Sequence, residues 1–450
     1  MDRYVEQFRK SFDTMLPRNL HTGLAKSAII MDGLKASVEA RADSAGLPAV
    51  QKEHALQLPI RQWFSKTTAV NQGRIGCHPD FAHLEGTDEK ESHYITTMFV
   101  DIKNSTRLAL HYPLEDVQHI KNSILRAASE TVRAMDGHVH RFMGDALMAY
   151  FGGKNQSKET TAMAAVCCAV MLRAVMQIVV VPALITRQID ATDLGFRVGI
   201  DFGDDSEVLW SSYGFSEVNE VTATSFYVDV SAKLQSMASK DRAMLGNNLV
   251  KLLDLPETLT SQKFVERGGN RIAEPFLRPN YQLPNGSSQN YVIRELNYEM
   301  FAALLPLPTE LKGEITTDII SRNGIAFSAD IINQSNMIRY PSLSACLSKN
   351  VTIKFTLTAD LGSLDGLRLP IRGRFTKQNY GREAEDNSQT VPEVISFEYS
   401  PKSSKLGAPI PYIESFERVT AYRGVHFVTV ELVDRDGTKV YREAIGVHIC

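Results

Sequence analysis

The spacing of hydrophobic and polar positions changes along this 450-residue chain, and the changes divide it into segments. Near the N-terminus, Tyr4, Phe8 and Phe12 lie four residues apart, which predicts an amphipathic helix that packs on another surface, with a second copy of the chain as one candidate. The polar stretch 85–92 indicates a boundary. We therefore predict an N-terminal helical extension and linker over residues 1–90.

The next segment alternates between strand and helix patterns. Apolar runs at 94–101 and 196–203 predict strands, residues 138–151 predict a hairpin, and the apolar stretch 158–181 predicts a covering helix. Another amphipathic helix falls between the first strand and the hairpin. The order is βαββαβ, so the sequence predicts an α+β, ferredoxin-like domain over residues 91–258.

The C-terminal part has a different composition. Residues 259–290 are rich in Gly, Pro and Asn, which predicts a linker. From 291 to 450, several runs alternate with a period of two and are enriched in β-branched and aromatic residues. This pattern is typical of an antiparallel β-sandwich.

Charge and cysteine content narrow the classes of function. A formal net charge of −3 gives no overall attraction for nucleic acid or anionic lipid. The five cysteines lack the spacing of a zinc site, and they disfavour a disulfide framework. The first ten residues carry charges of both signs, unlike a signal peptide, so the cytoplasm is the expected location.

One apolar stretch requires a membrane test. Residues 162–185 are almost continuously apolar, but Arg173 lies near the middle and Pro182 near the end. An arginine at the centre of a bilayer costs roughly 2.5–3.5 kcal/mol on insertion scales. We therefore predict a helix buried against a sheet and no stable membrane insertion.

Two isolated carboxylates lie at the ends of predicted strands. Asp101 ends the strand "YITTMFVD", and Asp145 stands at the turn of the hairpin "RFMGDALMAYFGG". Aspartates at the ends of neighbouring strands can converge, and their oxygens suit Mg²⁺ or Mn²⁺. Backbone N–H groups of Asn104, Ser105 and Thr106, at a helix start, would then attract phosphates.

These motifs together resemble a known family. The segments "FVDIKNST", "HRFMGDALMAYFGG", "FRVGIDFG" and "FYVDVSAKLQSMAS" occur in the order and spacing of the class III nucleotide cyclase catalytic domain. The resemblance implies that Asp101, Asp145 and the carbonyl of Ile102 hold two Mg²⁺ or Mn²⁺ ions. It also implies that Arg197 binds phosphate.

The late helix departs from the family pattern. Where the family has an Asn and an Arg four residues apart, this chain has Asp229 and Lys233. Lys233 can act as a point cation on developing charge, although it lacks the guanidinium fork. Asp229 cannot donate a hydrogen bond when ionised, so it orients Lys233 or a water, or only caps local structure.

The base-reading positions implied by the resemblance are Arg141 and Thr222, and they match neither the adenine nor the guanine pattern of the family. A guanidinium only donates hydrogen bonds, so Arg141 suits the carbonyls of uracil and conflicts with the 4-amino group of cytosine unless it reads O2. The sequence therefore favours UTP as substrate, with CTP second.

With its helical extension and β-rich C-terminal part, the chain resembles the bacterial Pycsar antiphage cyclases. The resemblance implies that it makes cyclic UMP or cyclic CMP, which acts on a separate effector. The C-terminal domain resembles, more faintly, the sensor domain of such enzymes. Members of the wider cyclase family share active sites across a homodimer, which two-fold symmetry would complete here.

Three alternatives remain open from the sequence. A purine cyclase acting on ATP or GTP would share the metal aspartates. Diguanylate cyclases also carry carboxylates on a hairpin, although "FMGDALM" lacks their usual turn motif. A degenerate domain that only binds nucleotide is suggested by Asp229 and Lys233, whereas the presence of both Asp101 and Asp145 favours an active enzyme.

Overall fold

The computed structural model describes residues 3–16, 54, 56–66, 69–215, 218–278, 281–334, 336–360, 362–399 and 412–450. These residues form two compact units. The first contains 1–62, 66–154 and 168–244, and the second contains 63–65, 155–167 and 245–450. The domain boundaries expected from the sequence, after residues 90, 258 and 290, stay predictions.

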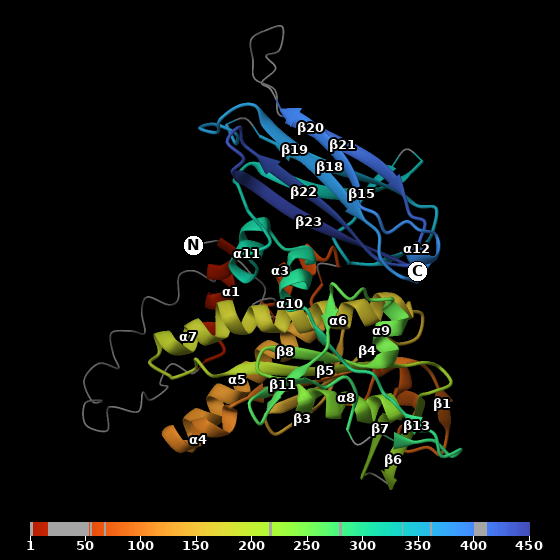
Figure 1. The fold of residues 1–450 in the computed structure, drawn as a ribbon. Helices are drawn as coiled ribbons and strands as arrows, with labels where there is room; N and C mark the ends of the chain where they lie inside the picture. Colours follow the sequence, from red (N-terminus) through yellow and green to blue (C-terminus); the bar gives the residue numbers. More distant parts are fainter. Residues whose placement is uncertain are drawn as a thin grey trace, which may run out of the picture. The chain divides into compact units, whose positions relative to one another are not determined.

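A twisted antiparallel sheet forms the centre of the first unit (Figure 1). Its strands are ordered β3-β4-β2-β5, with β2 between β4 and β5 and antiparallel to both. This is the order of a βαββαβ ferredoxin-like fold, so the α+β prediction is confirmed. The strands are β2 (Ile95–Lys103), β3 (His138–Met143), β4 (Ala146–Phe151), β5 (Gly195–Gly203) and, next to β5 in the sheet order, β8 (Arg242–Leu245).

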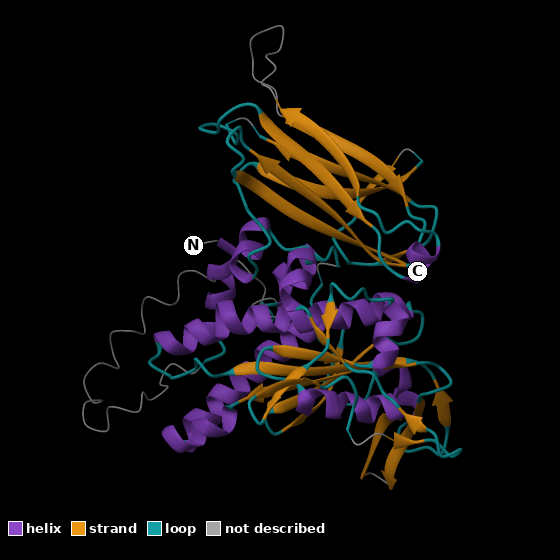
Figure 2. Cartoon of the chain, in the orientation of Figure 1, coloured by secondary structure: helices purple, strands orange, loops and turns teal. Residues whose placement is uncertain are grey.

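Helices cover both faces of this sheet (Figure 2). The helix α5 (Leu114–Ala134) follows Pro113 and has acidic residues in its first turn, which suit the positive end of the helix dipole. The helix α8 (Phe226–Met237) lies directly on β5. Its approach requires a glycine, because a Cβ at Gly199 would lie 2.2 Å from the backbone of α8.

The long apolar stretch forms α6 (Lys158–Val175), one π-helical turn (Met176–Val180) and α7 (Val181–Thr186). By length and composition it could cross a membrane, the one helix of the described residues that could. However, 72% of its most apolar window is buried inside the protein. A helix in the core of a folded domain has this burial, as the sequence analysis expected.

The N-terminal helix is present as α1 (Arg3–Asp13). Phe8 and Phe12 are 2% and 0% exposed, so the chain itself covers this apolar stripe. Arg9 Nε also donates a hydrogen bond to the carbonyl of Ile178 at 2.8 Å. The side chain of Tyr4 lies outside the described residues. A second copy of the chain is therefore not needed to bury the helix.

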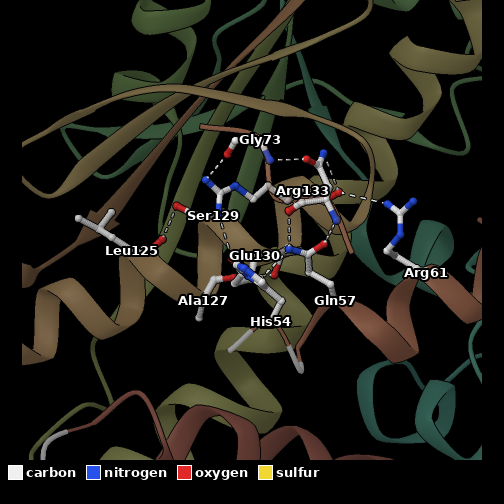
Figure 3. A network of polar contacts seen from close by, with 11 residues as sticks. His54, Gln57, Arg61, Gly73, Leu125, Ala127, Ser129, Glu130 and Arg133 are labelled. Atoms are coloured by element: carbon white, nitrogen blue, oxygen red, sulfur yellow. Dashed lines mark hydrogen bonds and ion pairs between the residues drawn. The ribbon is translucent and has the colours of Figure 1, made fainter. Parts of the chain in front are cut away.

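A buried carboxylate on α5 forms hydrogen bonds with the chain segment that contains the short helix α3, Gln57–Trp63 (Figure 3). Glu130 is only 2% exposed, and its carboxylate lies 2.9 Å from His54 Nδ1. It also accepts a hydrogen bond of 2.8 Å from Nε2 of Gln57, the first residue of α3. Arg133 donates to Glu130 and, at 2.6 Å, to the carbonyl of Gly73. These contacts hold the chain on both sides of residues 67–68, which are not described, against α5.

Two sheets stacked face to face form most of the second unit, which confirms the predicted sandwich. One has the order β16-β15-β18-β21 and the other β17-β23-β22-β19-β20. Phe355 and Phe375, from opposite sheets, both stack or tilt against Phe416 with ring centroids about 5 Å apart. The strands are β15 (Ile325–Asn333), β16 (Asn336–Arg339), β17 (Cys346–Leu347), β18 (Thr352–Ala359), β19 (Ile371–Gln378), β20 (Glu393–Tyr399), β21 (Tyr412–Val419), β22 (Gly424–Val433) and β23 (Lys439–Ile449).

The segment expected to be a linker contains short paired strands. Two hairpins, β10 with β11 and β12 with β13, occupy most of it. The elements in this region and in the rest of the second unit are α9 (Asn247–Leu253), β9 (Thr260–Ser261), β10 (Phe264–Arg267), β11 (Asn270–Ala273), β12 (Tyr281–Gln282), β13 (Ser288–Gln289), β14 (Arg294–Leu296), α10 (Tyr298–Leu304), α11 (Thr309–Ile315) and α12 (Arg382–Asp386).

The cysteine analysis needs one correction. In the described part of the chain a single disulfide joins Cys346 and Cys450, whereas the sequence analysis disfavoured a disulfide framework. The two residues are 104 positions apart, and they meet because β17 pairs in parallel with β23. Sequence spacing cannot reveal a pair that only the sheet brings together. Cys167 and Cys168 are buried and are not part of a disulfide, as expected for a core helix.

The contact of α8 with β5 gives a stability prediction. The substitution Gly199→Ala should lower the free energy of unfolding by about 2–3 kcal/mol, because the new methyl would overlap Ser231 O and Gln235 N. Thermal unfolding followed by circular dichroism should show a clear fall in melting temperature. The control is Gly313→Ala in α11, where no atom lies within 4 Å of the added Cβ, and it should be neutral or slightly stabilising.

Candidate active site

The two predicted metal aspartates lie side by side at one end of the central sheet. Asp101 is near the end of β2, and its partner across β4 is Ala146, the residue after Asp145. The backbone N–H of Ile102 donates to the carbonyl of Asp145 at 3.1 Å, which fixes the hairpin turn beside the strand end. The structure therefore brings together all three residues that the sequence proposed as metal ligands.

These residues line an open pocket of about 480 Å³. Its walls come from β2, the β3–β4 turn, the segment after β2 and the start of β5. The lining residues are Asp101, Ile102, Lys103, Asn104, Thr106, Arg107, Asp145, Asp193 and Arg197. A pocket with three carboxylates and several cations around it can hold a ligand that combines positive ions with phosphate.

Each aspartate faces a cation of the same chain. The strand register places Arg197 opposite Asp101, and Arg197 Nε lies 2.5 Å from Asp101 Oδ2. Lys121, from α5, lies 3.4 Å from Asp145 Oδ2. Ser105 also donates a hydrogen bond to Asp145. The carboxylate charge is thus compensated in a partly buried site, where an unpaired charge would be costly.

The predicted phosphate segment follows β2 directly. Asn104 has a left-handed backbone with φ of 66°, and the short 3₁₀ turn Ser105–Arg107 and the helix α4 (Leu108–His111) come next. Asn104 and Thr106 are exposed and line the pocket, whereas Ser105 is buried against Asp145. Asn104 also donates to the carbonyl of Asp193 at 3.0 Å. The role of this segment in binding phosphate stays a prediction.

The donor set fits Mg²⁺ or Mn²⁺ better than zinc. Two carboxylates and a peptide carbonyl are hard oxygen ligands, and a few such ligands suffice for an ion that keeps water or phosphate oxygens in its shell. In the described part of the chain, no group of three or more His, Cys, Asp or Glu residues could hold a metal ion. The oxygen donors of Asp101, Asp145 and Ile102 make this pocket the candidate metal site.

A second polar cluster lies on the other half of the β3–β4 hairpin, facing a small sheet of β1 (Lys90–Ser92), β6 (Leu209–Phe215) and β7 (Val218–Thr224). Arg141, on β3, forms an ion pair with Glu220 on β7. Its Nη2 also lies 3.0 Å from Nε2 of His140. Glu220 was not singled out by the sequence analysis.

His140 fixes one side of this cluster. Its ring is 1% exposed, and burial lowers its pKa, so it is neutral at pH 7. Nδ1 lies 2.9 Å from the carbonyl of Gly76, which can only accept a hydrogen bond. Nδ1 therefore carries the proton, and Nε2 accepts from Arg141. This arrangement positions the guanidinium between His140 and Glu220.

Thr222 belongs to the same cluster. Its hydroxyl lies 3.1 Å from that of Tyr150, a fully buried residue of β4 whose pKa burial raises to about 12. Thr222 is two residues after Glu220, so both side chains are on one face of β7. The structure thus brings the predicted base-reading residues Arg141 and Thr222 together. The same alternation was the signal in the sequence that could have identified Glu220.

Asp229 and Lys233 lie elsewhere. They are one turn apart on α8, and both are exposed, while Ser231 and Leu234 of this helix are buried. Neither is among the residues that line the aspartate pocket. Within one chain the structure does not bring them to Asp101 and Asp145. Their catalytic roles stay predictions that depend on a second chain.

Comparison with known proteins agrees with this fold and pocket. Residues 87–273 match the model of the adenylate and guanylate cyclase catalytic domain. A cytidylate cyclase of Escherichia coli is 35% identical over 404 residues, covering 88% of each chain. A cytidylate cyclase of Staphylococcus aureus is 31% identical, covering 90% of this chain and 88% of that one. A uridylate cyclase of Burkholderia cepacia is 24% identical, covering 44% of this chain and 86% of that one.

The chain belongs to the class III nucleotide cyclase family. The family resemblance drawn from the sequence is therefore confirmed, and a nucleotidyl cyclase is the class of enzyme that the relatives support.

Three histidines, two on β3 and one next to it, predict that the folded protein loses stability in acid. Burial lowers the pKa values of His138 and His140, and it lowers that of His78 to about 4 from 6.5. In the folded protein these histidines are neutral, whereas in the unfolded chain they bind protons below about pH 6.5. Their effect on the free energy of unfolding is therefore fully favourable above pH 6.5, and it is lost as the pH falls toward 4. The melting temperature of the protein should fall steeply over that range.

The contribution of His78 can be separated by substitution. His78→Gln should be less stable at pH 7 but lose less stability between pH 6.5 and 4.5. The exposed His111 serves as control, and His111→Gln should follow the curve of the unmodified protein. A His78→Gln curve parallel to the unmodified one would contradict this assignment.

Proposed function

We propose that this protein converts a pyrimidine nucleoside triphosphate, CTP or UTP, into its 3′,5′-cyclic monophosphate and pyrophosphate. The observation that carries the proposal is the meeting of Asp101 and Asp145 at one pocket, beside a cation that can bind phosphate. The 3′-oxygen attacks the α-phosphorus in line, the bond to the bridging oxygen of the β-phosphate breaks, and pyrophosphate leaves.

Asp101, Asp145 and the carbonyl of Ile102 would hold two Mg²⁺ or Mn²⁺ ions. When bound, such ions supply an activated 3′-hydroxyl and neutralise triphosphate charge. The chain's own cations assist. Arg197, already directed at Asp101, binds phosphate oxygens, and Lys121 balances the remaining carboxylate charge. Backbone groups of the segment from Asn104 to Thr106 orient the chain of phosphates.

The remaining groups come from a partner subunit. Asp229 and Lys233 are exposed on α8, so a two-fold axis could bring them to the pocket of the other chain. Lys233 then faces the charge that develops at the α-phosphate, and Asp229 holds Lys233 in place. Arg141 and Thr222 of the same partner read the base. The active form is a homodimer with two shared sites.

Two observations bear on the base. Arg141 alone favours the carbonyls of uracil, which is why the sequence prediction placed UTP first. The relatives at 31–35% identity that span most of the chain are named cytidylate cyclases, and this supports CTP. The pattern at Arg141 and Thr222 differs from the purine cyclases, so ATP and GTP are weaker candidates.

The biological setting proposed is bacterial antiphage defence in the cytoplasm. The cyclic nucleotide acts as a second messenger on a separate effector protein, and the β-sandwich senses infection. This role is inferred from the sequence resemblance to the Pycsar antiphage cyclases, and the pyrimidine cyclase relatives support the kind of product that it requires. The competing function, a degenerate domain that only binds nucleotide, is favoured by one feature, the replacement of the family's Asn and Arg by Asp229 and Lys233.

The proposed activity can be measured directly. The purified protein, incubated with Mn²⁺ and each of the four ribonucleoside triphosphates, should yield cyclic CMP or cyclic UMP by mass spectrometry. Asp145→Asn should reduce the rate at least about 100-fold, since it removes a charged ligand. Asp88→Asn, at an exposed carboxylate outside the pocket, is the control and should be fully active.

Other products would decide between the alternatives. Cyclic AMP or cyclic GMP as main product would contradict the pyrimidine proposal. A dinucleotide would indicate diguanylate-type chemistry. Binding of a triphosphate with no product from any of the four would favour the degenerate domain.

Site sharing predicts complementation between two inactive variants. Asp145→Asn lacks a metal ligand, and Lys233→Ala lacks the partner's cation, so each homodimer should be inactive. Mixed and reassociated, they form heterodimers in which one of the two sites has both groups intact. Up to a quarter of the unmodified activity should return, because half of the dimers are mixed and each has one working site. Absence of any recovery, with subunit exchange verified by two affinity tags, would exclude shared sites.

A further inference from the structure

Glu220 lies where it changes the hydrogen-bonding character of the predicted base site. Arg141 alone offers only donors, but its ion pair with Glu220 adds an acceptor beside them. Both side chains are about 40% exposed, so the pair presents itself to solvent on the hairpin surface. We infer that Glu220 is a specificity-determining residue that reads the 4-amino group of cytosine. This inference rests on the proposed pyrimidine cyclase function.

The pair is held in a defined orientation. Nη2 of Arg141 contacts both His140 Nε2 and Glu220, and His140 is fixed by the carbonyl of Gly76. In the described chain both contacts of the guanidinium use Nη2, so the Nη1 donors remain for a ligand. Glu220 Oε2 contacts Arg141, while Oε1 lies 3.2 Å from His140 Nε2.

The tautomer of His140 leaves Oε1 in need of a donor. Because Nδ1 carries the proton, Nε2 of the neutral ring has only a lone pair to direct at Oε1. Two acceptors 3.2 Å apart do not stabilise each other. A donor from a ligand would satisfy Oε1, and an amino group could do so without moving Arg141 or His140.

The edge of cytosine matches this array. Cytosine presents a 4-amino donor next to two acceptors, N3 and O2, whereas uracil presents a carbonyl, an N–H and a second carbonyl. Glu220 accepts from the amino group of cytosine while Arg141 donates to N3 or O2. With uracil, the O4 carbonyl would face the carboxylate, two acceptors would be left opposed, and N3–H would face the guanidinium.

Specificity for CTP over UTP follows. A site that pairs a polar group of one base and leaves its own groups unpaired with the other discriminates strongly. We expect a preference of about 10- to 100-fold, the range set by one polar group that loses water to the bound base without gaining a partner. The sequence prediction of uracil took account only of the hydrogen-bond donors of Arg141 and did not include Glu220, which lies beside them.

The test is equilibrium binding of CTP and UTP to the full chain, measured by calorimetry with Ca²⁺ in place of the catalytic metal, together with initial rates with Mn²⁺. The unmodified protein should bind CTP at least about tenfold more tightly than UTP. Glu220→Gln, which offers an amide N–H₂ to O4, should lower the CTP-to-UTP ratio at least tenfold. Glu220→Asp keeps the acceptor and should keep the direction of the preference.

The control variant is Glu257→Gln. Glu257 is also paired with an arginine, Arg294, but is 86% exposed and belongs to no part of the base-reading cluster. It should leave both affinities unchanged. Circular dichroism spectra and melting curves establish that each variant is folded.

The outcomes separate the two proposals. A preference for UTP, equal affinity for both, or an unchanged ratio in folded Glu220→Gln would overturn the role of Glu220 while leaving pyrimidine cyclisation intact. If neither CTP nor UTP is bound or cyclised, the proposed function fails, and the inference built on it fails as well.

Discussion

The antiparallel pairing of β2 with β4 and β5 is the constraint on which the site depends. Its register places Asp101 opposite both Ala146, next to Asp145, and Arg197. Three predicted site residues from three distant parts of the chain are thereby fixed by backbone hydrogen bonds. A slip of one residue would turn Asp101 to the other face of the sheet. The buried apolar residues of β2 oppose such a slip, so packing of the core and geometry of the pocket are specified together.

The same hairpin carries residues of both predicted sites, the metal site and the base site. The β3–β4 turn carries Asp145, while Arg141 on β3 faces the small sheet of β7. In a two-fold dimer, one hairpin would contribute a metal ligand to one site and a base-reading residue to the other. Arg141 lies only four positions before Asp145 in the chain. Binding of a nucleotide at one site would therefore affect the position of the hairpin residue that belongs to the other site.

The fold was largely predictable because the regular spacing of apolar residues over long segments determines it. The βαββαβ order, the α5 and α6 helices and the C-terminal sandwich all follow from periodicity, and the strand-end positions of Asp101 and Asp145 pointed to the pocket. The failures share a physical cause. The Cys346–Cys450 disulfide and the Arg141–Glu220 pair depend on strands far apart in sequence. Alternation along β7 places Glu220 on the same face as Thr222, but it does not encode which side chain of another strand Glu220 will meet.

The carbonyl of Gly76 connects the N-terminal part of the chain to the β3–β4 hairpin. It accepts from His138 and His140, and His78 packs against His138 and contacts the carbonyl of Gly152. The segment from Gly76 to His78 thus packs directly on the β3–β4 hairpin. Recombination that grafted a foreign N-terminal module at residue 91 would leave two histidines without their acceptor. Any exchange of the N-terminal part would therefore have to keep the segment around Gly76.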